Sequence, residues 1–123
     1  MDELATCIVD LERVTAALGA WPSLHEAEIV TLEFRRNGDT TARMTIKALP
    51  YDPTGRAPRA LLSLSFSEID EVEIRDFNEQ NVIGGLFAEP DGEKKRLVIS
   101  PTYGITGGCR FKDVEVVDVE RLD

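Results

Sequence analysis

The sequence predicts an α+β fold in which a mostly antiparallel sheet of roughly seven strands packs against one N-terminal helix. Residues 2–18 repeat apolar side chains at three- and four-residue steps, which is the period of a helix. Most of the chain after residue 29 alternates apolar and polar side chains in short runs, as half-buried strands do. Turn-forming pairs such as Asn37-Gly38 and Asp91-Gly92 separate some of these runs. Successive strands are therefore expected to form an antiparallel meander.

The expected helix over residues 2–18 has one apolar stripe, formed by Leu4, Cys7, Leu11, Val14 and Leu18. Asp2 and Glu3 suit the positive end of a helix dipole. Gly19, followed by Pro22, is a plausible stop. A helix with a single apolar stripe has to pack on something, and here it is expected to cover one face or one edge of the sheet.

Residues 21–28 mix rare residue types, with the only tryptophan, Trp21, and the only histidine, His25. The spacing of Ser23 and Glu26 matches a capping box, in which each side chain accepts from the other residue's amide at a helix start. Trp21 is then expected to anchor the core. Alternatively, His25, Glu26 and Glu28 form a polar site, although one histidine and two acids do not specify a metal or a catalytic pair.

Strand patterns follow from Val30 onward. A hairpin is predicted at Asn37-Gly38, and residues 41–48 alternate strictly. Residues 50–59 carry three prolines and a glycine, which predicts an exposed connecting loop. The next strand is expected to bury Leu62, Leu64 and Phe66.

The segment that follows holds the densest acidic run of the chain. Its carboxylates belong to Glu68, Asp70, Glu71 and Glu73. A solvated sheet face explains the run in structural terms, and an acidic contact surface explains it in functional terms.

Glycine patterns mark the C-terminal part. Gly84-Gly85 predicts a bulge or a close backbone approach within a strand. Residues 100–108 are expected to form a glycine-rich loop that carries Tyr103. A last strand is predicted over residues 110–119, and the offset of its valines indicates a bulge. It carries a second acidic set, Asp113, Glu115 and Asp118.

A chain of 123 residues fits one domain, residues 1–123. The first residues are acidic where a signal peptide is basic, and no apolar run approaches the ~20 residues that span a bilayer. Cys7 and Cys109 form no CxxC motif, so they are expected to be reduced and buried. These features together predict a cytoplasmic protein.

The net charge of −9 argues against nucleic-acid and anionic-membrane partners, because phosphate contacts need Lys and Arg. It suits the capture of a basic protein by electrostatic steering. The same charge also serves solubility without any partner.

The chain lacks a nucleophile elbow, an HExxH motif and a dinucleotide-binding fingerprint. We therefore expect no enzyme activity, no cofactor and no metal site.

Three segments carry a resemblance to a known family: Trp-Pro-Ser-Leu-His-Glu-Ala-Glu from Trp21, Phe-Asn-Glu-Gln-Asn-Val-Ile from Phe77, and Pro-Thr-Tyr-Gly from Pro101. In this order they resemble the immunity protein 50 family, small bacterial proteins encoded beside polymorphic toxins. The resemblance implies a protein that occludes a cognate toxin. Its motif polar cluster comprises Trp21, Ser23, His25, Glu26, Asn78, Asn81 and Tyr103.

Two functional hypotheses follow. In the first, the chain is an immunity protein that meets a basic toxin. The expected contact face is first the run of Glu68, Asp70, Glu71 and Glu73, and second the set of Asp113, Glu115 and Asp118. In the second, it is a small ligand-binding domain or enzyme that uses His25, Glu26, Asn78, Asn81 and Tyr103. A toxin-bearing gene immediately upstream distinguishes the first from the second. Under either hypothesis, residues 21–28 are expected to pack beside residues 78–81, with side-chain hydrogen bonds linking the two segments.

Overall fold

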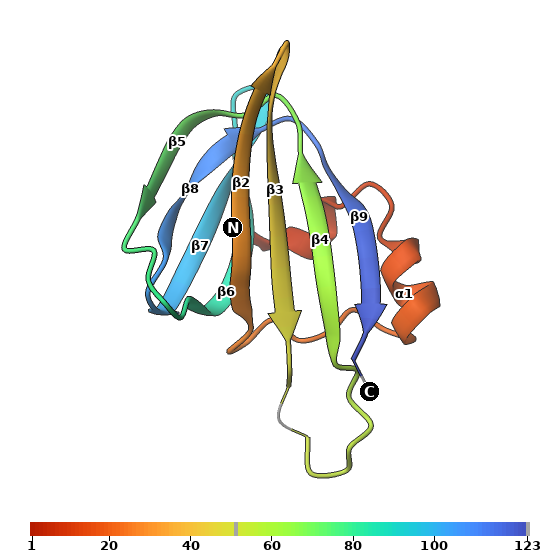
Figure 1. Ribbon diagram of the computed structural model, residues 1–123. Coiled ribbons are helices and arrows are strands. Elements are labelled where there is room, and N and C mark those ends of the chain that lie inside the picture. The colour runs from red at the N-terminus through yellow and green to blue at the C-terminus, as the bar shows by residue number, and fades with distance from the viewer. Residues whose placement is uncertain (51, 123) are drawn as a thin grey trace.

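The computed structural model describes residues 1–50 and 52–122, and over these residues it contains nine strands, one 3-10 helix and one α-helix (Figure 1). The helices are η1 (Leu4–Cys7) and α1 (Glu12–Leu18). The strands are β1 (Asp2–Glu3), β2 (Glu28–Asn37), β3 (Asp39–Ala48), β4 (Ala60–Phe66), β5 (Asp70–Arg75), β6 (Val82–Asp91), β7 (Lys94–Tyr103), β8 (Thr106–Phe111) and β9 (Val114–Arg121). The predicted α+β class and antiparallel pairing are confirmed, and the strand count is nine instead of roughly seven.

The strands lie in the order β5-β8-β7-β6-β2-β3-β4-β9, and β1 adds to β6. Two three-stranded meanders, β2-β3-β4 and β6-β7-β8, are present, but the meander predicted for the whole chain is wrong. The chain crosses between the two halves of the sheet after β4 and again after β8. The crossings are tied together, because Ser67 donates its N–H to Asp113 O and accepts from the N–H of Lys112, both at 2.9 Å. This break at residues 112–113 splits the single strand predicted over residues 110–119 into β8 and β9.

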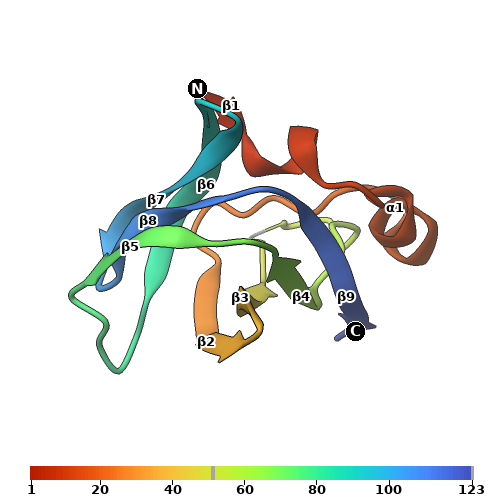
Figure 2. The same cartoon turned by 90° about the horizontal axis from the view of Figure 1, so that it is seen from above.

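The two halves of the sheet meet at the start of β2, where Glu28 pairs with Val82 of β6. Two further backbone bonds hold this junction: Ile29 N–H to Asn81 O and Ile83 N–H to Ala27 O, each 2.9 Å. Seen from above, β6, β7, β8 and β5 form one wall and β2, β3, β4 and β9 form the other (Figure 2). The junction therefore sets the angle between the two walls.

The core lies between these walls. In β4 the alternation is as predicted, and Leu62, Leu64 and Phe66 are fully buried. The opposite wall contributes Phe111 of β8, whose ring meets the Phe66 ring edge to face at a centroid distance of 5.2 Å. Such an aromatic pair stabilises beyond the area that it buries, so it joins the halves at the core.

The N-terminal segment departs from the predicted continuous helix. Residues 8–10 are not helical, because Ile8 bridges to Val114 of β9 and Val9 donates its N–H to Val114 O at 3.0 Å. Ile8 and Val9 are weak helix formers, so edge pairing outweighs the helix there. The α-helix is confined to α1, and Gly19 ends it at φ 86°, as predicted.

Helix α1 lies along the edge of β9 (Figure 1). Asp10 Oδ1 accepts from Val116 N–H at 2.8 Å, and Arg13 Nη1 donates to Val116 O at 2.5 Å. These contacts occupy strand-edge groups that would otherwise be open to another chain. The expectation that the helix covers an edge is confirmed.

The glycine-rich stretch over residues 100–108 is mostly strand, so the predicted loop is wrong. Only Gly104 and Ile105 interrupt β7 and β8. Gly107 lies in the ladder at φ +109°, and a Cβ there would overlap the carbonyl oxygen of Glu73 in β5. The missing side chains therefore let β5 approach β8 closely, which is a use of strand glycine.

The remaining turn predictions are confirmed. Hairpins form at Gly38 and at Gly92. The register of β6 shifts on either side of Ile83, next to Gly84-Gly85, and that of β9 shifts at Val117. The loop before β4 is organised by Asp52, whose carboxylate accepts from three backbone N–H groups, those of Thr54, Arg56 and Ala57.

Candidate functional site

The first motif segment forms a turn, so the predicted capping box is wrong. Ser23 Oγ accepts from the N–H of His25 at 3.3 Å, and no helix follows. Glu26 has φ 63°, and its N–H donates to Ile83 O at 2.8 Å. This turn leads the chain into β2. Trp21 packs against the core but is only partly buried, whereas Ser23, His25 and Glu26 are exposed.

Asn81 is the one buried polar residue in the described part of the chain, at 3% exposure. Its Oδ1 accepts from the N–H of Asn78 at 2.9 Å and of Ile105 at 3.1 Å, and its Nδ2 donates to Asn78 O at 2.9 Å. A Cβ on Gly104 would lie 2.8 Å from Asn81 Oδ1 and 2.5 Å from Gln80 O. Asn81 therefore joins the second and third motif segments, and Gly104 leaves room for it.

The expected convergence of the motif segments is confirmed, but with different bonds. The first segment is joined to residues 81–83 by backbone hydrogen bonds alone, although side-chain bonds were expected. Asn78 Oδ1 accepts a hydrogen bond from the N–H of Glu79 at 2.9 Å. Tyr103 is 52% exposed. No side-chain hydrogen bond among the described residues joins His25 or Glu26 to Asn78, Asn81 or Tyr103. The segments meet as a scaffold, without forming one polar centre.

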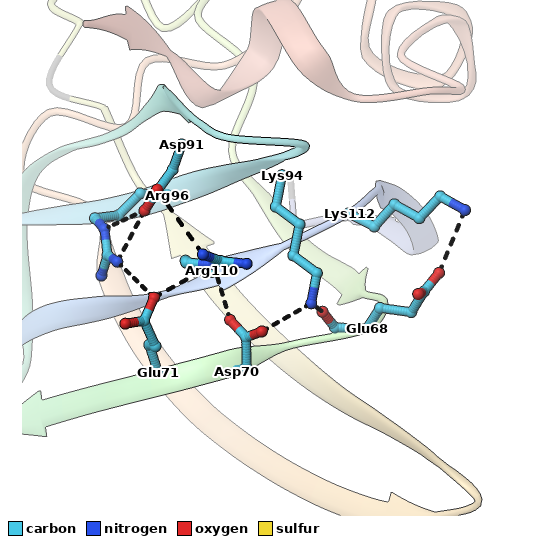
Figure 3. Close-up of polar contacts among 8 residues, drawn as sticks. All are labelled: Glu68, Asp70, Glu71, Asp91, Lys94, Arg96, Arg110 and Lys112. Atoms are coloured by element: carbon cyan, nitrogen blue, oxygen red, sulfur yellow. Dashed lines mark hydrogen bonds and ion pairs between the residues drawn. The ribbon is translucent and has the colours of Figure 1, made fainter.

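The acidic run that begins at Glu68 lies against a set of cations on β7 and β8 (Figure 3). Asp70 lies 2.9 Å from Lys94 Nζ and 3.0 Å from Arg110 Nε. Glu71 lies 3.0 Å from Arg96 Nη2 and 3.3 Å from Arg110 Nε. At the two ends of the run, Glu68 pairs with Lys112 at 3.4 Å and Glu73 with Arg75 at 3.6 Å. Every carboxylate of the run therefore has a cationic partner.

Charge cancels within this cluster, which we call the β5 ion-pair network. Figure 3 contains four carboxylates and four cations: Glu68, Asp70, Glu71 and Asp91, with Lys94, Arg96, Arg110 and Lys112. The hydrogen bond from Lys94 lowers the pKa of Asp70, with a further contribution from Arg110. The hydrogen bond to Asp91 raises the pKa of Arg96. The run thus carries far less unpaired negative charge than its sequence indicates.

The second acidic set remains unpaired. Asp113, Glu115 and Asp118 are exposed, and Glu120 extends the set along β9. No ion pair to a described residue forms at any of the four. Across the β4–β9 ladder, Glu115 lies opposite Ser65 and Asp118 opposite Ser63, which are both small, whereas Glu120 lies opposite Leu61. We call these four residues the β9 acidic column.

A hollow of about 350 Å³ lies beside the first motif turn. It is lined by three separate segments: residues 3–5, residues 21–25 and residues 84–87. Sequence reasoning singled out Trp21 and His25 but missed Glu3 and Phe87. Only the pairing of β1 with β6, which sets Glu3 opposite Phe87, brings those two residues to the same place.

The described residues contain no cluster of three or more His, Cys, Asp or Glu side chains that could hold a metal ion. None of their helices is long and apolar enough to span a membrane. Both cysteines are free. Burial raises the pKa of Cys109 to about 11 and also raises that of Cys7. Neither thiol is therefore an activated nucleophile.

Comparison with known proteins adds one match. A family model described as "Immunity protein 50" matches residues 10–122. No curated protein and no solved structure matches the chain. The family match covers the three motif segments, the β5 ion-pair network and the β9 acidic column.

Proposed function

Since the chain belongs to the immunity protein 50 family, we propose that it binds and neutralises a cognate protein toxin of a bacterial polymorphic toxin system. The family match over residues 10–122 is the observation that carries this proposal. The protein would act by covering the toxin, with no substrate turned over. We place this action in the cytoplasm, where a producing cell needs protection.

The chemistry of the surface supports a basic partner. The chain carries a net charge of −9, and the β9 acidic column contributes four exposed carboxylates that form no ion pair with a described residue. Such a surface raises the rate at which a positively charged protein is captured. A toxin that acts on a nucleic acid would present such a basic surface.

Of the two acidic sets, we propose the β9 acidic column as the primary contact, with the β5 run as the second. A toxin cation that contacted Asp70 or Glu71 would have to compete with Lys94, Arg96 and Arg110. Glu115 and Asp118 impose no such competition. This reverses the order expected from the sequence, where the basic partners of the β5 run could not be placed.

The ligand-binding alternative draws little support from the geometry. The side-chain oxygen and nitrogen of Asn81 both form hydrogen bonds with backbone groups, and the side-chain oxygen of Asn78 accepts the N–H of Glu79. These side chains therefore hold the fold and leave little capacity for a ligand. We retain one proposed function.

The test is complex formation between purified partners. The product of the adjacent toxin gene and this protein should co-elute from a sizing column. Calorimetry should show a one-to-one complex with a dissociation constant well below 1 μM, on the order of nanomolar. The absence of binding at micromolar concentrations of both proteins would refute the proposal.

A further inference from the structure

We propose that the hollow beside the first motif turn binds a cationic side chain, an arginine or lysine presented by the toxin. The inference rests on the proposed function for the identity of that partner. The binding chemistry of the hollow itself rests on the residues that line it.

Two aromatic rings line the hollow, those of Trp21 and Phe87. Each is partly buried, so part of its surface remains open. Among the described residues, only Phe66 and Phe111 form a ring pair, and no cation stacks on either Trp21 or Phe87. Open faces of tryptophan and phenylalanine attract ammonium and guanidinium groups through the ring quadrupole.

The strand beneath the rings is shaped for this arrangement. Gly85 lies two residues before Phe87 on β6, and a Cβ on Gly85 would lie 3.0 Å from the Phe87 ring. Glycine at this position therefore allows the ring to lie close over the strand. The paired glycines, which in the sequence indicate a bulge or a close backbone approach, also form one side of the hollow.

A carboxylate completes the site. Glu3 lines the hollow and is exposed, and its side chain makes no ion pair with any described residue. Its backbone is fixed by β1, which pairs Glu3 with Phe87, and by the bond from Thr6 Oγ1 to Glu3 O at 2.8 Å. A cation in the hollow would therefore find a carboxylate whose backbone position is fixed by β1.

The hollow has room for one long side chain. Its volume of about 350 Å³ exceeds what a single arginine side chain fills, and its mouth is open to solvent. An aromatic-lined slot with one carboxylate is a common way to bind such a group. Ser23 and His25 stand at the wall with side-chain polar groups that could bond further atoms of the same partner segment.

The single tryptophan provides the readout, because intrinsic tryptophan fluorescence reports on Trp21 alone. We would titrate the intact chain, tagged only at its C-terminus, with N-acetyl-arginine amide, N-acetyl-lysine amide and neutral N-acetyl-norleucine amide. The two cations should give saturable changes with dissociation constants on the order of 1–10 mM. The neutral probe should give none.

The matched variants are Glu3→Gln and Glu12→Gln. Both remove one exposed carboxylate that forms no ion pair within the described part of the chain, but only Glu3 lines the hollow. Glu3→Gln should weaken binding of the cationic probes about threefold to fivefold, whereas Glu12→Gln should leave it unchanged. Equal response to the norleucine probe, or equal behaviour of the two variants, would overturn the inference.

The toxin arm separates this inference from the function on which it rests. Glu3→Lys should weaken the toxin complex at least tenfold. If the complex forms and Glu3→Lys leaves its affinity unchanged, the toxin does not use the hollow and the inference fails, while the proposed function stands. If no complex forms with the unchanged chain, the proposed function fails, and the probe titration alone decides whether the hollow binds cations.

Discussion

Asn81 Oδ1 accepts the backbone N–H of Ile105 at a distance of 3.1 Å, across 24 residues of sequence. The same oxygen accepts from Asn78 N–H, so one buried amide closes the turn before β6 and the turn between β7 and β8. Both segments belong to the motifs that resemble the family. The asparagine is thus required by the scaffold, independently of any ligand.

Replacing Asn81 by alanine should destabilise the protein by about 3 kcal/mol, because two backbone donors lose their partner and the Ile105 N–H is buried. Asn78→Ala is the matched control, since its side chain serves only the exposed Glu79 N–H; it should cost about 0.5 kcal/mol. Urea unfolding followed by Trp21 fluorescence measures both. Equal effects would contradict the role given to Asn81.

Gly107→Ala should destabilise by about 3 kcal/mol or more. Its φ of +109° disfavours a side chain, and the new Cβ would overlap Glu73 O, so β5 would have to move. Gly38→Ala shares a positive φ of +87° but has no atom within 4 Å of the new Cβ, and it should cost about 1 kcal/mol. Gly38→Ala tests backbone strain alone, whereas Gly107→Ala tests backbone strain together with the overlap on Glu73. Thermal unfolding measures both variants. Similar melting temperatures would contradict the close approach of β5.

The loop before β4 should resist acid down to about pH 2. The hydrogen bond from the Thr54 hydroxyl, followed by those from backbone N–H groups, lowers the pKa of Asp52 from its ordinary value of 3.8 to about 2. Because the folded protein favours the ionised Asp52 carboxylate, this group stabilises the fold above pH 3.8. The stabilisation is lost as the pH falls through about 2, where the carboxylate becomes protonated in the folded protein. Asp52→Asn should therefore be less stable than the parent above pH 4, with a gap that closes toward pH 2. Titration of the Asp52 carboxyl by NMR checks the cause, and a midpoint near 3.8 would contradict it.

Charge reversal on the β9 acidic column should slow toxin association. The double substitution Glu115→Lys and Asp118→Lys should reduce the association rate about tenfold at low salt and flatten its salt dependence. Glu93 lies at the exposed β6–β7 turn and forms no ion pair with any residue that the structure describes, so Glu93→Lys should change the rate far less if steering is local to β9. Stopped-flow mixing at several salt concentrations measures this. If Glu71→Lys and Glu73→Lys slow association more than the β9 pair does, the β5 run is the contact instead.

Much of the sheet could be predicted because the signals for its strands and hairpins lie in neighbouring residues of the sequence. The alternation that buries Leu62, Leu64 and Phe66 and the Asn37-Gly38 hairpin are properties of adjacent residues. The helix over residues 2–18 could not be predicted correctly, since Ile8 and Val9 pair with a strand more than 100 residues away. The crossings at Ser67 and Asp113 are equally non-local.

The candidate site shows the same division. The sequence identified the acidic runs, but it could not place Arg96 and Arg110 beside Glu71, because strand order decides that contact. It offered the first motif as a helix cap or as a polar site, and the structure shows a turn without a helix, so the expected cap at Ser23 was wrong. Nothing local indicated that Glu3 and Phe87 would share a hollow with Trp21.

The central claim is that this protein neutralises a cognate toxin, and co-expression tests it most directly. The adjacent toxin gene would be induced in a sensitive host, with this chain supplied from a second promoter at graded levels. The account predicts growth arrest by the toxin alone and full recovery once the chain reaches the level of the toxin, as stoichiometric occlusion requires. Growth arrest that persists at excess of the chain, or an adjacent gene product that is harmless by itself, would contradict the account.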